Sequence, residues 1–66
     1  MSKPIIIAVD AMGGDDSPNK IIAGISEYAK KSKNVFFRIF GLKVLIEKEL
    51  LKNDVKKDFY EIIECN

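Results

Sequence analysis

The sequence predicts an α/β fold in which parallel strands alternate with helices. Residues 5–9 form an uninterrupted apolar and mostly β-branched run, which is typical of a parallel strand covered on both faces. Apolar side chains then recur at helical spacing, and a second aromatic and β-branched run at residues 35–40 repeats the cycle. The resulting order of strand, helix, strand, helix, strand is half of a doubly wound domain with right-handed crossovers.

The first helix is expected at residues 18–32. Asp16 or Ser17 is a suitable N-cap, and Pro18 suits the first helical turn. Lysines within residues 30–33 favour the negative end of the helix dipole, so they are interpreted as a solvated helix end.

The second strand is expected to end in a turn at Gly41. Arg38 interrupts its apolar run. A guanidinium in such a place either reaches past a sheet edge to water or pairs with a carboxylate. A phosphate-binding role for Arg38 is the less favoured alternative, because the middle of a strand lies away from the ligand crevice.

A second apolar helical stripe covers residues 42–51, and residues 53–54 are expected to end that helix. The pattern of residues 59–65 predicts a third strand, although the two glutamates within it are also compatible with a short helix. Cys65 is expected to be a small apolar strand residue rather than a nucleophile, because the chain has no histidine to activate it.

Charge and length exclude several function classes. The 66 residues carry 11 Lys and Arg against 10 Asp and Glu, and this near-balance argues against nucleic acid as a partner. The N-terminal apolar run is too short for a signal peptide or a membrane span, which predicts a cytoplasmic location. A chain of this size buries only about 60% of its surface. Three parallel strands also leave two open sheet edges, so we expect the chain to be the start of a larger protein.

The loop after the first strand holds the candidate functional residues. It lies where ligands of open parallel sheets bind, outside the carboxyl end of a strand and before a helix. Glycines there let backbone N–H groups turn toward a phosphate at the helix N-terminus, while the acids brace the loop or bind a substrate donor. The candidate substrate-binding residues are Asp10, Met12, Gly13, Gly14 and Asp15.

Two other interpretations compete with this one. Asp10 resembles the strand-ending aspartate of sugar kinases and actin-like ATPases, or the aspartyl nucleophile of some phosphatases. The phosphatase pattern has a second aspartate where this chain has Met12. The actin-like fold has a hairpin strand after its glycines, whereas Pro18 indicates a helix. The loop is also compatible with an ordinary turn whose glycines supply positive φ and whose acids cap the helix. Nucleotide-binding G-x-G-x-x-G and P-loop patterns are absent. Asp15 and Asp16 beside Asp10 are more typical of turns and caps than of ion ligands, so no metal and no cofactor are expected.

The residues around this loop resemble a known family. Residues 7–15, with the sequence Ile-Ala-Val-Asp-Ala-Met-Gly-Gly-Asp, followed by Pro18 at the start of a helix, look like the N-terminus of the bacterial phosphate acyltransferases of fatty acid and phospholipid synthesis. The resemblance covers the whole chain as an N-terminal portion only. Residues 1–66 are therefore expected to be the N-terminal α/β portion of a larger single enzyme domain, in truncated form.

The resemblance implies a fold and a reaction. The fold is the three-layer, parallel βαβαβ half-unit of an isocitrate and isopropylmalate dehydrogenase-like domain, used without a nicotinamide cofactor. The enzymes convert fatty acyl-[acyl carrier protein] and inorganic phosphate to acyl phosphate and free carrier protein, as homodimers with peripheral membrane association. Gly13 and Gly14 would then form the phosphate cradle that Asp10 and Asp15 shape. No catalytic residue is assigned, and this portion is expected to be inactive alone.

The sequence departs from the family pattern at two positions. Ser17 stands where a glycine often precedes the proline, and Leu42 stands where an acidic residue usually follows Gly41. A non-enzymatic alternative also stays open, namely a small α/β binding or interaction module whose Gly-Gly loop is structural.

Overall fold

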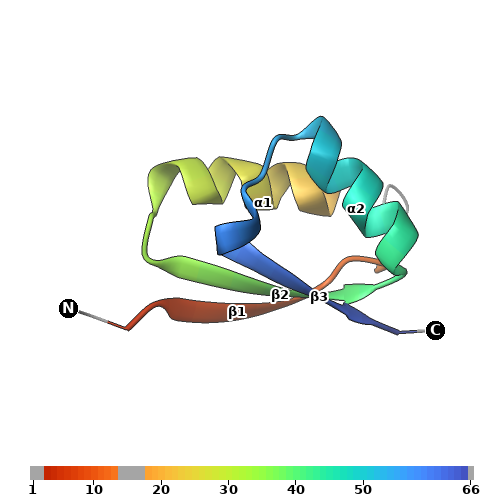
Figure 1. Ribbon diagram of the computed structural model, residues 1–66, viewed down its shortest axis with the longest axis horizontal. Helices are drawn as coiled ribbons and strands as arrows, with labels where there is room; N and C mark the ends of the chain where they lie inside the picture. The colour runs from red at the N-terminus through yellow and green to blue at the C-terminus, as the bar shows by residue number, and fades with distance from the viewer. Residues whose placement is uncertain (1–2, 14–17, 66) are drawn as a thin grey trace.

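The computed structural model describes residues 3–13 and 18–65. Its three strands form one parallel sheet in the order β1-β2-β3, and both α-helices lie on the same face of that sheet (Figure 1). The parallel βαβαβ arrangement is confirmed, and the described residues supply the sheet and one helix layer of it. The elements are β1 (Ile5–Asp10), α1 (Asn19–Lys31), β2 (Val35–Gly41), α2 (Lys43–Lys52), the 3-10 helix η1 (Lys57–Phe59) and β3 (Tyr60–Glu64).

The central strand β2 sets the register of the sheet. Its partners run from Ile5 opposite Val35 along β1, and from Tyr60 opposite Phe37 along β3. Because all three strands are parallel, their carboxyl ends meet at one edge of the sheet, where Gly41 lies opposite Glu64.

Alternate side chains of β2 build the core between the sheet and the helices. Val35, Phe37 and Ile39 face the helices and are at most 4% exposed. The ring of Tyr28 on α1 meets Phe37 edge-on, with ring centroids 5.9 Å apart. The remaining core residues are Ala11, Ile22, Ile25, Ile46 and Leu50.

The helix boundaries are close to those predicted. The helix α1 begins at Asn19, one residue later than expected, with Pro18 at its N-cap position. The candidate caps Asp16 and Ser17 lie outside the described residues. The end of α2 is confirmed: Asp54 adopts φ 55° there, and its N–H donates to the carbonyl of Leu51 at 3.3 Å. The hydroxyl of Ser26, which is buried on α1, donates to the carbonyl of Asn53 at 3.2 Å and ties the two helices together.

The ion pair of Arg38 settles its role in the strand. Its Nε donates to Oε2 of Glu61 at 2.9 Å, and Glu61 is its direct neighbour across β2 and β3. The carboxylate alternative is therefore confirmed. The alternative that the guanidinium reaches past a sheet edge to water is wrong, because β2 is the central strand and has no free edge in the sheet.

Two further expectations need correction. The third strand begins at Tyr60 rather than at Phe59, which still belongs to η1. The prediction that residues 5–9 are covered on both faces is wrong within the part of the chain that the structure describes, since Ile6 is 54% exposed. The physical reason is topological: both crossovers step in the same direction along the sheet, so they place both helices on one face.

We expect the two faces of β2 to respond differently to substitution. Ile39→Val removes a methylene from a site that is 0% exposed and should lower the free energy of unfolding by about 1 kcal/mol. Arg38→Gln breaks an ion pair whose side chains are 50% and 47% exposed, so it should cost no more than about 0.5 kcal/mol. Urea unfolding followed by circular dichroism measures both changes, and a larger loss for Arg38→Gln would contradict this assignment of the core.

Candidate functional site

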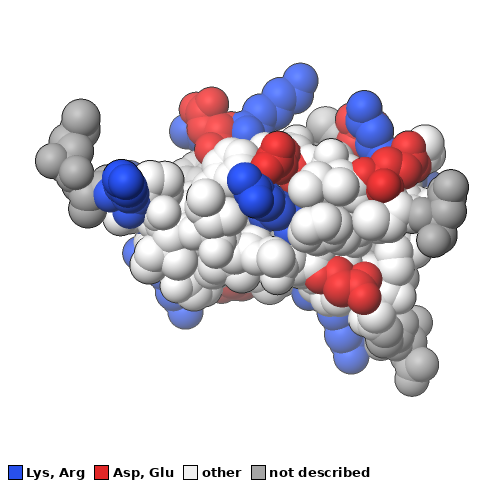
Figure 2. Space-filling model, turned by 90° about the horizontal axis from the view of Figure 1, so that it is seen from below, with Lys and Arg blue, Asp and Glu red and all other residues white. Residues whose placement is uncertain are grey.

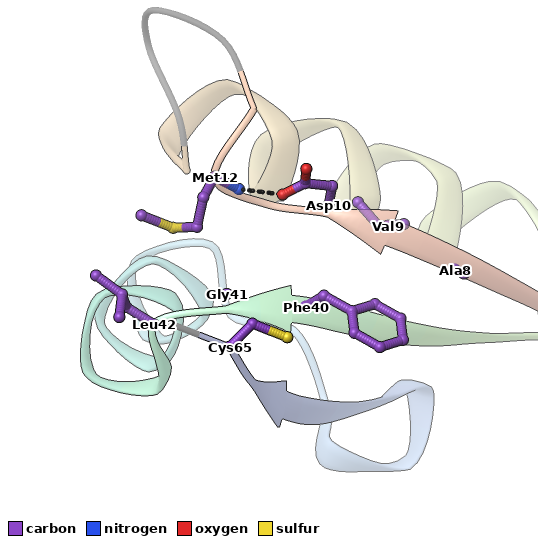
Figure 3. Close-up of a pocket in the computed structure, with 8 residues that line it drawn as sticks. All are labelled: Ala8, Val9, Asp10, Met12, Phe40, Gly41, Leu42 and Cys65. Atoms are coloured by element: carbon purple, nitrogen blue, oxygen red, sulfur yellow. Dashed lines mark hydrogen bonds between the residues drawn. The ribbon is translucent and has the colours of Figure 1, made fainter.

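An open hollow of about 650 Å³ lies at the carboxyl edge of the sheet. Figure 3 shows its walls, which come from the end of β1, the loop that follows, the junction of β2 with α2 and the residue after β3. Its lining is mostly apolar. The residues are Ala8, Val9, Asp10, Met12, Phe40, Gly41, Leu42 and Cys65.

Asp10 organises the loop that follows β1. The backbone N–H of Met12 donates to its Oδ1 at 3.0 Å, which closes a turn of the kind that aspartate side chains form with the residue two positions on (Figure 3). A Cβ placed on Gly13 would stand 3.5 Å from Oδ2 of the same carboxylate. The carboxylate therefore lies along the loop and braces its backbone. The other two candidates, Gly14 and Asp15, lie outside the described residues.

Ala11 anchors the start of this loop to the core. Its side chain is 0% exposed, and its N–H donates to the carbonyl of Phe40 at 2.9 Å, which continues the pairing with β2 beyond the end of β1. Sequence reasoning missed this residue. A small apolar residue between Asp10 and Met12 was the available signal, since only a small side chain fits where the backbone meets the core.

Met12 packs against the end of β2. A Cβ on Gly41 would stand 2.6 Å from Cγ of Met12 and 3.0 Å from Cδ1 of Ile46, so any larger residue there would force these side chains to shift. Gly41 has φ 155°, in a region that residues with a side chain rarely adopt. Gly41 was expected to form a turn after the strand, but it is the last residue of β2 and forms one wall of the hollow.

The two helix N-termini at this edge differ in their surroundings. At α2, the first helical N–H, that of Lys43, donates to Oε2 of Glu64 at 3.1 Å. Glu64 thus brings a carboxylate from the end of β3 to the first turn of α2. At α1, the first turn holds no acidic residue. Helix N-termini attract anions, and at α2 the carboxylate of Glu64 already meets the first N–H.

The described residues lack several other kinds of feature. Within residues 3–13 and 18–65, no three acidic or cysteine side chains are grouped so as to hold a metal ion. None of the helices in the described part of the chain has the length and apolarity needed to cross a membrane. Cys65 was expected within the third strand, but it follows β3, is exposed and lies on the hollow.

The chain is similar to curated proteins named phosphate acyltransferase. It is 51% identical to that of Pelagibacter ubique over 63 residues, which is 96% of this chain and 18% of that protein. It is 41% identical over 59 residues to that of Caldicellulosiruptor bescii and 36% identical over 66 residues to that of Caulobacter vibrioides, again over 18% of each. No protein-family model matches the chain.

The chain corresponds to an N-terminal portion of the phosphate acyltransferase family. It spans about a fifth of the length of the phosphate acyltransferases that it matches. The hollow and the loop braced by Asp10 therefore lie in the region that these relatives share with the chain.

The contact between Met12 and Gly41 leads to a first prediction for this phosphate acyltransferase portion. Gly41→Ala should lower the free energy of unfolding by about 1–3 kcal/mol, because the new methyl group meets Met12 and the backbone is strained at φ 155°. Gly24→Ala is the matched control: a Cβ there has no neighbour within 4 Å, so the change should stabilise α1 by about 0.5–1 kcal/mol. Thermal and urea unfolding measure both effects. Equal stability of the two variants would show that the Met12 contact imposes no constraint.

The turn at Asp10 leads to a second prediction. Asp10→Ala removes the acceptor of the Met12 N–H, so the exchange of this amide proton with solvent should accelerate by roughly threefold or more, as expected for the loss of one exposed hydrogen bond. Asp10→Asn keeps a side-chain oxygen at the same place and should leave the exchange close to that of the unsubstituted chain. Hydrogen exchange followed by NMR distinguishes the two variants. Identical rates in both would mean that the carboxylate does not hold the loop.

Proposed function

We propose that this chain supplies the phosphate-binding part of an enzyme that transfers a fatty acyl group from acyl-[acyl carrier protein] to inorganic phosphate. The products are acyl phosphate and free carrier protein, in phospholipid synthesis. The observation that carries the proposal is the position of the family-like loop, at the carboxyl end of β1 and before the N-terminus of α1. Anionic ligands of parallel α/β sheets bind at that position.

The loop suits a phosphate nucleophile better than it suits a cation. In the proposed site, backbone N–H groups of Gly13 and Gly14 turn toward the phosphate, helped by the positive end of α1. Oδ1 of the Asp10 carboxylate accepts a hydrogen bond from the Met12 N–H, so this oxygen faces the backbone of the loop. Asp15 shapes the same loop in this proposal.

The chemical step requires little covalent participation from the protein. A phosphate oxygen attacks the thioester carbonyl carbon, the new C–O bond forms, and the C–S bond breaks. The electron pair of that bond leaves with the carrier-protein sulfur, which takes up a proton as the free thiol. Backbone N–H donors lower the barrier by stabilising the negative charge that develops on the carbonyl oxygen. No described residue is assigned to proton transfer.

The hollow beside the loop fits the second substrate. Met12, Phe40 and Leu42 present apolar surface to it, as the alkyl chain of an acyl group requires. In the proposal the partners are therefore inorganic phosphate and acyl carrier protein. The proposal includes a homodimer located in the cytoplasm with peripheral membrane association, and it treats residues 1–66 as the N-terminal α/β portion of one larger enzyme domain.

The alternative is a non-catalytic α/β module with a structural loop. One observation favours it: the contacts of Asp10 and Met12 described above lie within the loop and the sheet edge. The two functions differ in what phosphate does to the loop amides. A purely structural loop has no reason to respond to phosphate more than to another anion of equal ionic strength.

The decisive experiment restores the missing part of the enzyme. Residues 1–66 replace the matching region of the Pelagibacter ubique phosphate acyltransferase, and phosphate-dependent release of carrier protein is measured. Asp10→Ala should lower kcat/KM by about 10-fold or more, because a loop displaced by even a fraction of an ångström misplaces the nucleophile. Asp58→Ala, on η1 and outside the hollow, is the control and should stay within about twofold.

A binding measurement on the chain itself complements this assay. Titration with inorganic phosphate, followed by NMR, should shift the Gly13 amide, while chloride at equal ionic strength should not. An unmoved amide in the folded chain, together with full activity of Asp10→Ala in the chimera, would rule out the role proposed for the loop and favour the structural module.

A further inference from the structure

We propose that Leu42 is a specificity-determining residue, whose side chain contacts the alkyl chain of the acyl substrate in the hollow and favours long acyl groups over short ones. Because this is a role in the acyl transfer proposed above, it rests on that proposed function. The role is one of binding, so no covalent step is assigned to Leu42.

Leu42 occupies the N-cap position of α2. Ser, Thr, Asp and Asn are preferred there, because a side-chain oxygen accepts a hydrogen bond from one of the first helical N–H groups. The backbone of Leu42 has φ −80° and ψ 114°, in the extended region that such capping residues adopt. A polar cap would fit this backbone, yet the side chain of leucine has no oxygen. Helix capping therefore does not explain the residue, and a departure from a local rule is typical of functional positions.

A carboxylate from another strand caps the helix instead. Oε2 of Glu64 accepts a hydrogen bond from the N–H of Lys43, the first residue of α2, at 3.1 Å. Glu64 is the last residue of β3 and lies opposite Gly41 in the sheet, so strand pairing brings its carboxylate beside the start of α2. One of the unpaired N–H groups of the helix is thereby satisfied without the N-cap side chain. The side chain of residue 42 is left available for a different contact.

The side chain of Leu42 lies on the hollow. It is 37% exposed, and it lines the hollow together with Met12 and Phe40. Figure 3 shows Leu42 and Met12 at the same end of the hollow. They are close because Cγ of Met12 stands 2.6 Å from the place of a Cβ on Gly41, the residue before Leu42. Met12 and Leu42 thus form one apolar wall, which is called here the end wall.

The lining of the hollow indicates an uncharged ligand group beside the end wall. Among the described residues that line it, Asp10 alone is an acid or a base other than a thiol, and its Oδ1 already accepts the N–H of Met12. The volume of about 650 Å³ is within the range of pockets that hold small molecules. The acyl substrate offers one uncharged part of variable length, its alkyl chain. Each methylene group that leaves water strengthens binding about fourfold, so an apolar wall discriminates between chain lengths.

The end wall and the loop proposed for phosphate border the same hollow. Asp10 pairs with Phe40 in the register of β1 and β2, and Leu42 follows two residues after Phe40. In the proposal the reacting carbonyl lies beside the loop, and the alkyl chain extends from it along the end wall. Leu42 therefore affects the choice of the acyl group without contacting the phosphate.

The first test measures chain-length preference in the chimera with the Pelagibacter ubique enzyme. Leu42→Asn is compared with Leu45→Asn, a matched control, because Leu45 is 41% exposed on the same helix and does not line the hollow. Leu42→Asn should lower kcat/KM for the palmitoyl thioester of the carrier protein by about 10-fold or more, and for the butyryl thioester by less than about twofold. Leu45→Asn should leave both values within about twofold. Leu42→Met, which keeps an apolar side chain of similar volume, should retain the preference for the long chain.

The second test measures the stability of the 66-residue chain. Asn at position 42 supplies the missing N-cap oxygen, whereas Asn at position 45 replaces a good helix former in the first turn. Both substitutions remove leucine surface of similar exposure, so the thermal midpoint of Leu42→Asn should exceed that of Leu45→Asn by about 4 °C or more. A variant that is better capped and less selective is expected where a residue serves the ligand rather than the fold.

The third test is a binding measurement that does not depend on the chimera. The 66-residue chain is titrated with decanoyl pantetheine, an uncharged acyl thioester, and the methyl signal of Met12 is followed by NMR. The signal should shift in the unsubstituted chain and in Leu45→Asn. In Leu42→Asn the dissociation constant should rise by about fourfold or more, as expected for the loss of contact with one methylene group or more.

The outcomes separate this proposal from the proposed function. An active chimera whose chain-length preference Leu42→Asn leaves unchanged would overturn the role of Leu42 alone, as would an equal loss with both thioesters. A thermal midpoint that Leu42→Asn lowers much more in the chimera than in the chain would show that a segment of the enzyme, and not a ligand, covers the end wall. A chimera that is inactive with every acyl group would count against the proposed function. The titration then decides on Leu42, and equal dissociation constants for its Asn variant and the unsubstituted chain would overturn the proposal.

Discussion

The pairing of β2 with both of its neighbours is the constraint on which the rest of the structure depends. Every helix-facing side chain of this strand is in the core, and Ile39 at its centre is 0% exposed. Since both pairings are parallel, the strand also brings the carboxyl ends of β1 and β3 to one edge. The candidate site is therefore a product of strand order. Without the central strand, Asp10 and Cys65 would have no common surface.

Two hydrogen bonds beyond the strand ends turn that edge into a shaped surface. The N–H of Ala11 donates to the carbonyl of Phe40 at 2.9 Å, and the N–H of Cys65 donates to the carbonyl of Gly41 at 3.0 Å. They hold the segments after β1 and β3 against the end of β2. Met12 then lies across Gly41, where any larger residue would collide with it. These contacts fix the position of the walls that the segments after β1 and β3 contribute to the hollow.

The sequence was sufficient to predict the element order, because each element carries its own local signal. The apolar run of β1, the helical stripe of α1 and the left-handed Asp54 at the end of α2 are properties of neighbouring residues. What could not be predicted depends on contacts between residues far apart. The carboxylate partner of Arg38 follows from the register of β2 against β3, and the capping of Lys43 by Glu64 joins residues 21 positions apart. Coverage of β1 was mispredicted for the same reason: an apolar run indicates an interior strand, but the placement of both helices on one face follows from the strand order.

The two helix N-termini at the carboxyl edge differ in the contacts that the structure gives them. A helix N-terminus is attractive to an anion only while no carboxylate already stands there. Glu64 meets the first N–H of α2, which makes that end a closed structural junction between β3 and α2. The first turn of α1 holds no acidic residue, and the nearby carboxylate of Asp10 is turned toward the N–H of Met12. Since α2 has no acidic residue in its own first turn either, the described difference between the two helix ends is the carboxylate that Glu64 brings from β3.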